Sequence, residues 1–243
     1  MDDTHNDLTP EQMVNLVTAS NAMKLLRWSD LEKIDFTWLI HETLPSHGIS
    51  IIYGDTILTK CAIVEIAATI ASGREWYSRK TRQGHVVYVT TEGLYGLKYR
   101  VDKWLHNTHT DRDLIRSHFH IIDANKLFLT TKNTDMLLHT LTDLAFPVQL
   151  LVIDTLPFPI EREILDFIST LQQRLSCHLC LTYYRDLYET EEGTGFDIVK
   201  EWADTIMHLA YDNHTMTITC EKQRDGAMPF NDIEANTLGY TAL

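Results

Sequence analysis

Apolar runs that alternate with helical segments are the feature that most constrains how this chain folds. Four short runs rich in branched and aromatic side chains begin at Ile49, His85, Val148 and Cys177, and they read as buried strands. Strands that are apolar on both faces need a layer of helices on each side, which is the arrangement of a parallel sheet. The sequence therefore predicts an α/β fold with a mostly parallel central sheet, helices on both faces and a short antiparallel C-terminal extension.

The composition narrows the class of protein. A chain of 243 residues with 44% hydrophobic and 23% charged residues suits one globular domain with short appendages. The net charge of -13 argues against binding nucleic acid through bulk positive charge, although a local basic channel stays open. No apolar run approaches the ~18 residues of a membrane span, and the acidic start is not a secretory signal. We expect no membrane association and a cytoplasmic location.

The chain is predicted to have two parts. Residues 1–27 read as a helical appendage, in which Thr9 caps a helix, Pro10 occupies its first position and Gln12 completes a capping box. Residues 28–243 then form the main domain. Within it, a short strand-like run is expected at residues 118–122.

Two groups of possible metal ligands are better explained without a metal. Cys177 and Cys180 lie in an apolar run and face opposite sides of a strand, so we expect core cysteines rather than a zinc site. His118 and His120 alternate onto one strand face with no carboxylate nearby in the sequence. We expect a surface pair there and predict no metal site.

The stretch Ile49–Gly73 has the layout of a phosphate-binding loop: an apolar strand, a loop that begins at Gly54, a lysine and a helix. A working loop follows G-x-x-x-x-G-K-[ST], in which backbone N–H groups wrap the phosphates and the lysine neutralises their charge. Gly54 and Lys60 match the first glycine and the lysine. Lys60 is expected either to contact phosphate or only to solvate the helix start.

Two positions of this pattern depart from what the loop needs. Thr59 replaces the second glycine, and a branched residue disfavours a turn with positive φ. Cys61 replaces the hydroxyl residue, and a thiol is a poor ligand for Mg²⁺, which prefers hard oxygen atoms. We expect binding of ATP and Mg²⁺ to be weak or absent, with a tolerated variant loop as the alternative.

Further stretches from Trp28 to about Gly239 occur in the order found in one known family. "HVVYVTTEG", "LLVIDTL" and "CEKQRDG" follow the phosphate-loop stretch in that order. The chain thus resembles the RepA-type hexameric helicase ATPases of the RecA-like P-loop superfamily. The resemblance implies a RecA-like fold, a ring, ATP with Mg²⁺, and single-stranded DNA as a partner.

The resemblance also assigns candidate catalytic residues. It places Glu92 as the catalytic glutamate, Asp154 at the Walker B position, and Lys222 and Arg224 as residues that reach the neighbouring subunit's nucleotide. Without the resemblance, Glu92 can equally be an ordinary surface carboxylate at the end of a strand. Asp154 can equally belong to a common turn that follows a strand. Lys222 and Arg224 likewise fit a solvated hairpin end.

Other segments depart from the family pattern. "IDTLPFPIEREIL" lacks the acidic, glycine-rich loop that follows Walker B in the family, and "LTYYRD" stands where paired histidines are expected. Tyr183 and Tyr184 are of a kind that stacks on bases, but the acidic residues that follow them repel phosphate. These departures weaken the prediction of a helicase function more than they weaken the prediction of the fold.

Three functions follow from the sequence. The leading hypothesis is a degenerate RepA-like protein that acts in DNA replication or DNA transactions of a mobile element, through assembly and binding rather than ATP turnover. The second is an active ATP-dependent helicase ring. The third is a subunit that caps or regulates rings of an intact relative. The partners expected are copies of the same chain, a RecA-like relative and single-stranded DNA.

Overall fold

The structure is a computed structural model that describes residues 25–33, 35–91, 93–124, 131–156, 162–184, 196–212, 215–226, 229 and 232–235. The chain divides into two compact units, Met1–Thr37 and Trp38–Leu243. The described part of the first unit holds one short helix, α2 (Trp28–Leu31). Most of the predicted appendage at residues 1–27 lies outside the described residues, so its helix stays a prediction.

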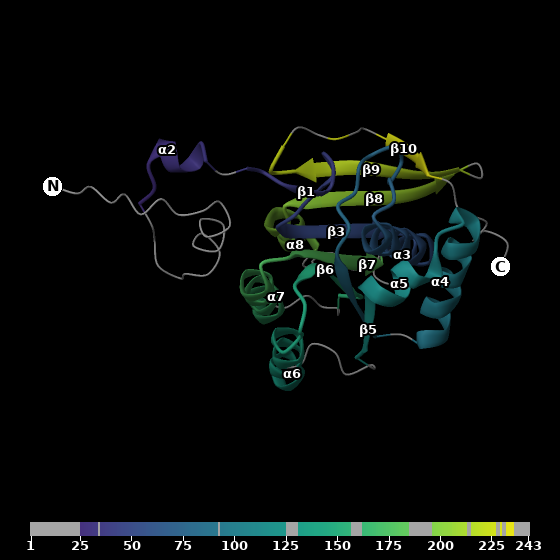
Figure 1. Ribbon diagram of the computed structural model, residues 1–243. Helices are drawn as coiled ribbons and strands as arrows, with labels where there is room; N and C mark the ends of the chain where they lie inside the picture. The colour runs from purple at the N-terminus through teal and green to yellow at the C-terminus, as the bar shows by residue number, and fades with distance from the viewer. Residues whose placement is uncertain are drawn as a thin grey trace. The chain divides into compact units, whose positions relative to one another are not determined.

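An eight-stranded sheet forms the centre of the second unit (Figure 1), with the order β10-β9-β8-β3-β7-β6-β4-β5. The six strands from β8 to β5 pair in parallel, whereas β9 is antiparallel to both β8 and β10. The predicted mostly parallel sheet with an antiparallel C-terminal extension is therefore confirmed. The strands are β3 (Gly48–Gly54), β4 (His85–Thr90), β5 (Phe119–Asp123), β6 (Val148–Asp154), β7 (His178–Tyr184), β8 (Thr205–Asp212), β9 (Thr215–Gln223) and β10 (Asp232–Ala235).

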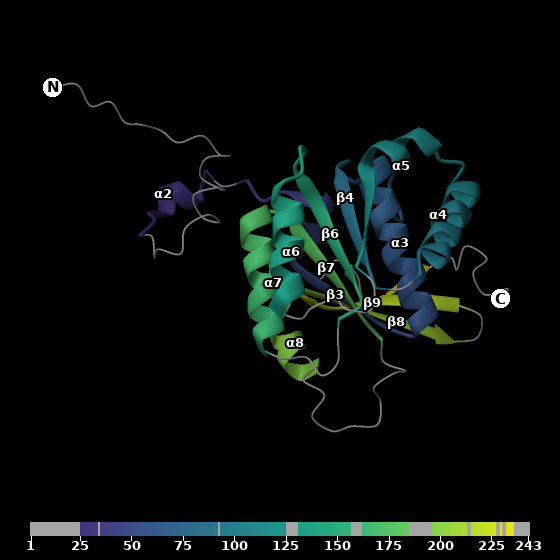
Figure 2. The same cartoon turned by 90° about the horizontal axis from the view of Figure 1, so that it is seen from below.

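Helices cover both faces of the sheet, as predicted (Figure 2). Alternate residues of each buried strand supply two separate cores: Leu150 and Val152 of β6 pack toward one face, and Leu151 and Ile153 toward the other. A separate two-stranded sheet joins β1 (Trp38–Ile40) and β2 (Leu44–Pro45). The helices are α3 (Thr56–Ser72), α4 (Leu94–Thr108) and α5 (Arg112–His118) on one face, and α6 (Thr131–Thr142), α7 (Arg162–Leu175) and α8 (Phe196–Trp202) on the other.

The strand predicted at residues 118–122 is present as β5 (Phe119–Asp123), but His118 belongs to helix α5. The Asp111 side chain caps α5 by accepting a hydrogen bond from the Asp113 amide at 2.9 Å, and His118 is its last residue. The strand β5 begins one residue later, so His118 and His120 do not share a strand face. Both rings instead lie beside His85, whose Nδ1 is 3.1 Å from Nε2 of His120. Within the described ranges, no group of three or more His, Cys, Asp or Glu side chains is placed to hold a metal ion.

The cysteines of the fourth apolar run are core residues, as predicted. Cys177 and Cys180 are buried and carry free thiols. Burial raises the pKa of the Cys177 thiol to about 12 and raises that of Cys180 as well. Both thiols therefore stay protonated and pack as small apolar side chains.

A buried serine–histidine pair joins the two central strands. Ser50 of β3 and His178 of β7 are both fully buried, and Ser50 Oγ lies 2.7 Å from His178 Nε2. Burial, and to a lesser extent the nearby His47, lower the pKa of His178 to about 3. His178 is therefore neutral in the folded protein over the whole physiological range.

This pair predicts a loss of stability in acid. The unfolded chain protonates this histidine near its ordinary pKa of about 6.5, whereas the folded chain does so only near 3. Unfolding therefore takes up a proton between these two values, so the free energy of unfolding falls as the pH drops through that window. The expected slope is about 1.4 kcal/mol per pH unit. Denaturant unfolding of the wild type and His178→Gln at several pH values measures it. If the free energy of unfolding depends on pH in the same way for both proteins, His178 is not the cause of the loss of stability in acid.

Candidate functional site

The carboxyl ends of the central parallel strands form the candidate site. Gly54 of β3 pairs with Tyr184 of β7, and Thr90 of β4 pairs with Asp154 of β6. Ligands of open parallel sheets bind at this edge, outside the carboxyl ends of the strands. The edge carries the predicted phosphate-loop residues and Asp154.

Gly54 needs to be a glycine for a steric reason that does not involve a ligand. Its φ is 149°, a conformation that side chains disfavour. A Cβ atom at this position would lie 2.3 Å from the carbonyl oxygen of Leu209 in the neighbouring strand β8. The first glycine of the phosphate-loop pattern is thus required by sheet packing.

The segment that should form the phosphate loop is helical. The helix α3 begins at Thr56, inside the segment that the phosphate-loop pattern assigns to a loop before Lys60. Its N-cap is Asp55, whose Oδ1 accepts hydrogen bonds from the amides of Ile57 (2.9 Å) and Leu58 (3.2 Å). Asp55 also accepts the Thr59 amide through its backbone carbonyl oxygen at 2.9 Å. The amides of this turn are therefore bonded to Asp55.

The side chains of Thr59 and Cys61 point into the protein. Thr59 is helical and fully buried, so it does not adopt the positive φ that the second glycine of a working loop would need. No residue in the described ranges offers its Oγ1 a hydrogen bond. Cys61 is also buried, and burial raises the pKa of its thiol to about 12. A protonated, buried thiol does not coordinate Mg²⁺.

Lys60 lies between these two buried residues and is half-buried. Its Nζ is 5.2 Å from the centroid of the Tyr184 ring, which is the geometry of a cation–π contact. The lysine of the phosphate-loop pattern thus contacts an aromatic side chain of the same chain.

Hydroxyl groups surround the carboxylate of Asp154, the last residue of β6. Its Oδ2 accepts a hydrogen bond from the Tyr88 hydroxyl at 2.7 Å. Its Oδ1 accepts from Thr182 at 2.8 Å, from Thr155 at 3.3 Å and from the Tyr184 hydroxyl. The side chain is only 1% exposed. Both oxygens are therefore engaged in a buried network.

The two tyrosines of this network remain protonated donors. Burial raises the pKa of Tyr88, and the negative charge of Asp154 raises it further. The same two causes, in the same order, raise the pKa of Tyr184. Because these hydroxyls stay protonated, both donate hydrogen bonds to the Asp154 carboxylate.

Glu92 lies outside the described residues, so its catalytic role stays a prediction. Its neighbour Thr91 donates its amide to the Asp154 carbonyl oxygen at 3.1 Å, and its hydroxyl to the same atom at 3.2 Å.

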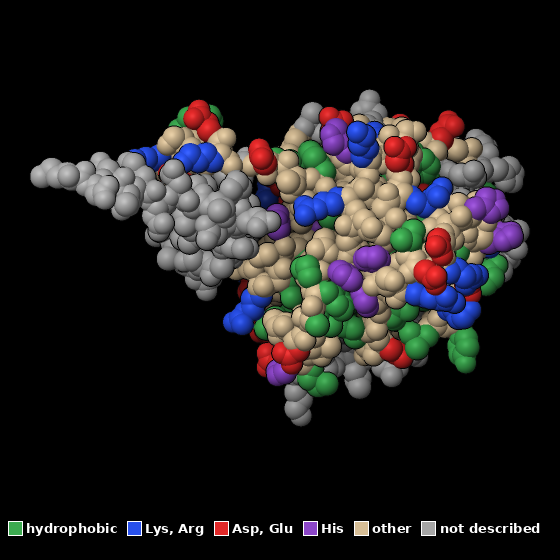
Figure 3. Space-filling view, viewed as in Figure 1, with side chains coloured by type: hydrophobic (Ala, Val, Ile, Leu, Met, Phe, Trp, Pro, Cys, Tyr) green, Lys and Arg blue, Asp and Glu red, His purple; other side chains and the backbone are tan. Residues whose placement is uncertain are grey.

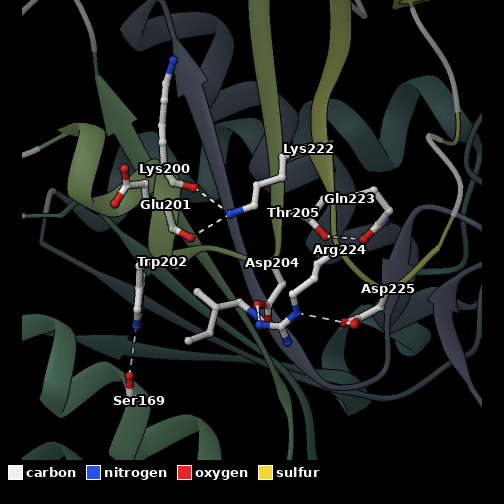
Figure 4. Close-up of polar contacts among 11 residues, drawn as sticks. Ser169, Lys200, Glu201, Trp202, Asp204, Thr205, Lys222, Gln223, Arg224 and Asp225 are labelled. Carbon is white, nitrogen blue, oxygen red and sulfur yellow. Dashed lines mark hydrogen bonds and ion pairs between the residues drawn. The ribbon is translucent and has the colours of Figure 1, made fainter.

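The side chain of Lys222 caps a helix (Figure 4). Its Nζ donates to the carbonyl oxygens of Lys200 at 2.9 Å and Glu201 at 2.8 Å, at the end of α8. A cation at a helix C-terminus satisfies carbonyl groups that have no partner within the helix. Lys222 therefore has a structural contact within its own chain.

Arg224 forms an ion pair with Asp204 (Figure 4). Its guanidinium lies 2.5 Å from Oδ1 of Asp204, whose Oδ2 accepts the amide of Ile49 at 2.9 Å. Burial raises the pKa of Asp204, and the Ile49 amide and Arg224 oppose that rise. Because Ile49 lies at the amino end of β3, Arg224 sits at the edge of the sheet opposite to Lys60. The two predicted groups therefore do not meet within one chain.

Charges of both signs are interspersed over the face shown in Figure 3. Several basic side chains of α4 and α5 are paired with acids: Asp102 contacts Lys98 and Arg112, and Arg116 contacts Asp113 at 2.6 Å. Exposed pairs of this kind contribute little to stability. They do reduce the positive charge that these helices present to a phosphate backbone.

Asp55 and the hydroxyl donors to Asp154 were not predicted from the sequence. Asp55 carried a local signal, because aspartate before a helical pattern is a preferred N-cap. No local sequence signal marks the hydroxyl donors, because only the order of the strands in the sheet brings them next to β6. These donors are Tyr88, Thr182 and Tyr184.

Comparison with known proteins identifies the family of this chain and supports its fold. Residues 20–159 match the AAA domain family. The chain belongs to that family, and so to the P-loop ATPase superfamily. No curated protein sequence is significantly similar to it. Among solved structures, it is similar to a KaiC-like protein of the hyperthermophilic archaeon Pyrococcus horikoshii OT3.

That similarity extends over 82% of this chain and 94% of the KaiC-like protein, with a TM-score of 0.52 and 18% sequence identity. It shows a shared fold, and the AAA domain protein described here has the RecA-like α/β architecture that the sequence predicted. None of its described helices is long and apolar enough to span a bilayer.

Gly54 provides a direct test of how the strand–helix junction is built. Gly54→Ala should lower the free energy of unfolding by about 2 kcal/mol or more, because the new methyl group meets the Leu209 carbonyl in a strained conformation. Gly93→Ala is the matched control, since Gly93 caps α4 after β4 and has open space around it. It should cost less than about 1 kcal/mol. Equal losses in urea unfolding would refute this assignment.

Proposed function

We propose that this AAA domain protein is a degenerate RepA/RecA-like P-loop protein that acts in DNA replication or DNA transactions of a mobile element. It works through assembly and binding, with weak or absent ATP hydrolysis. The observation that carries this proposal is the start of α3 at Thr56, inside the segment that a phosphate loop needs.

Triphosphate binding at this edge requires the first turn of α3 to open. Opening breaks the Asp55 cap, which contributes about 1 kcal/mol, and the helical hydrogen bond of the Thr59 amide, which contributes about another. A cost of about 2 kcal/mol weakens binding roughly thirtyfold. Fully buried Thr59 also has to leave the core, which weakens binding further.

A magnesium ion finds no open ligand among the residues that the pattern assigns to it. Cys61 offers a buried thiol, and Asp154 already accepts hydrogen bonds on both oxygens. Mg²⁺ keeps several water molecules and needs exposed oxygen ligands for them. ATP and Mg²⁺ are therefore proposed as weak or absent cofactors.

The role in DNA transactions rests on the resemblance to RepA-type ATPases and on the shared RecA-like fold. A ring of identical chains is the proposed assembly, with single-stranded DNA as its partner. In such a ring, the edge that carries Lys222 and Arg224 faces the nucleotide edge of the next copy.

A second candidate is a subunit that caps or regulates rings of an intact RecA-like relative. The Arg224 side chain remains 61% exposed although it pairs with buried Asp204. A subunit with this edge intact and its own phosphate turn closed can contact a neighbour's nucleotide without binding one itself.

Titration with ATP and Mg²⁺ tests the proposal. We expect no saturable binding below about 1 mM, which corresponds to about 4 kcal/mol, and no phosphate release above the uncatalysed rate. Isothermal calorimetry and a phosphate-release assay measure the two quantities. Turnover that disappears in Lys60→Ala would show an active ATPase and overturn the proposal. Copurification with a second RecA-like protein would favour the capping subunit, and a homogeneous ring of this chain alone would exclude it.

Binding of single-stranded DNA tests the proposed partner separately. We expect salt-dependent binding of an unstructured oligonucleotide at about 50 mM salt that weakens as salt increases, because phosphate contacts release counterions. Fluorescence anisotropy at several salt concentrations measures it. Absence of binding at the lowest salt would remove DNA from the proposed function.

A further inference from the structure

We infer that Asp55 is a built-in competitor of phosphate: its carboxylate takes the amides at the start of α3 and keeps this turn closed to an external anion. The inference deepens the proposed function and rests on it, because it names the group that closes the site. The contact between the Asp55 carboxylate and the Ile57 and Leu58 amides is intramolecular and autoinhibitory.

The geometry of the contact supports competition. A phosphate at a P-loop accepts hydrogen bonds from backbone amides that point toward it. Here Asp55 Oδ1 accepts from Ile57 and Leu58, at 2.9 and 3.2 Å. The carboxylate is attached one residue before the helix, so it reaches these amides without any loss of translational freedom. An external phosphate has to displace a tethered anion of the same charge sign.

Lys60 and Asp154, the other two charged groups of the site, also contact side chains of this chain. Lys60 lies over the Tyr184 ring, and the Tyr184 hydroxyl donates to Asp154. The amides, the lysine and the aspartate that a Mg-nucleotide would need thus all contact side chains of this chain. Removal of Asp55 alone frees only the amides, so its effect should be limited to anion binding without metal.

A second aspartate cap in the chain provides a matched control. Asp111 caps α5 by accepting the Asp113 amide at 2.9 Å. No element of the phosphate-loop pattern adjoins it in the sequence. Loss of either cap should destabilise the protein, but only loss of Asp55 should change its response to phosphate.

The experiment compares the wild type, Asp55→Ala, Asp55→Asn and Asp111→Ala in the full chain, with pyrophosphate as the probe and without metal. Both alanine variants should melt about 2–4 °C lower than the wild type, because each loses one cap. Only Asp55→Ala should regain stability as pyrophosphate is added, with binding at least about tenfold tighter than in the wild type. Asp55→Asn keeps an acceptor but loses the charge, so its gain should be about two- to fivefold.

The outcomes separate this inference from the proposed function. If Asp55→Ala responds to pyrophosphate no more than Asp111→Ala does, the inference is overturned, while the proposed lack of turnover still stands. If the wild type binds Mg-ATP tightly, the proposed function fails and the inference with it.

Should Asp55→Ala not fold, Asp55→Asn carries the test through its own affinity and through hydrogen exchange of the Ile57 and Leu58 amides. Faster exchange that pyrophosphate slows again supports the inference. Exchange that pyrophosphate leaves unchanged refutes it.

Discussion

The hydrogen bonds from the Ile57 and Leu58 amides to the Asp55 carboxylate are the interaction on which the rest of the site depends. They start α3 at Thr56, so the segment between Gly54 and Lys60 forms a helical turn instead of a loop. A helical turn fixes where each following side chain points. The side chains of Thr59 and Cys61 are consequently buried in the core between α3 and the sheet. A phosphate loop would need the residues at these two positions at its surface.

Other side chains at the carboxyl edge of the sheet are also engaged in contacts within the chain. The tyrosine at the end of β7 contacts both Lys60 and Asp154, and it thereby joins the cation and the carboxylate that a Mg-nucleotide would otherwise bridge. A buried carboxylate is stable only when hydrogen bonds compensate for its lost hydration. The hydroxyls of Tyr88 and Thr182 provide that compensation. These contacts support the proposal that the protein keeps the RecA-like fold while its binding of nucleotide is weak or absent.

Much of the fold could be predicted because buried parallel strands appear in a sequence as continuous apolar runs. The four predicted apolar runs correspond to β3, β4, β6 and β7. Helix α5 was missed because it is short and polar, and a local cap decides where it starts. The start of α3 was misjudged because Gly54 and Lys60 match a loop pattern, whereas the cap at Asp55 favours a helix. The hydroxyls around Asp154 come from strands far apart in the sequence, so no local pattern could show them.

A crystal structure of the protein soaked with a nonhydrolysable ATP analogue and Mg²⁺ tests the central claim most directly. We expect that α3 still begins at Thr56, that the Asp55 carboxylate still accepts the Ile57 and Leu58 amides, and that no metal binds beside Asp154. A triphosphate wrapped by residues 55–59, with Mg²⁺ seated next to it, would contradict the account.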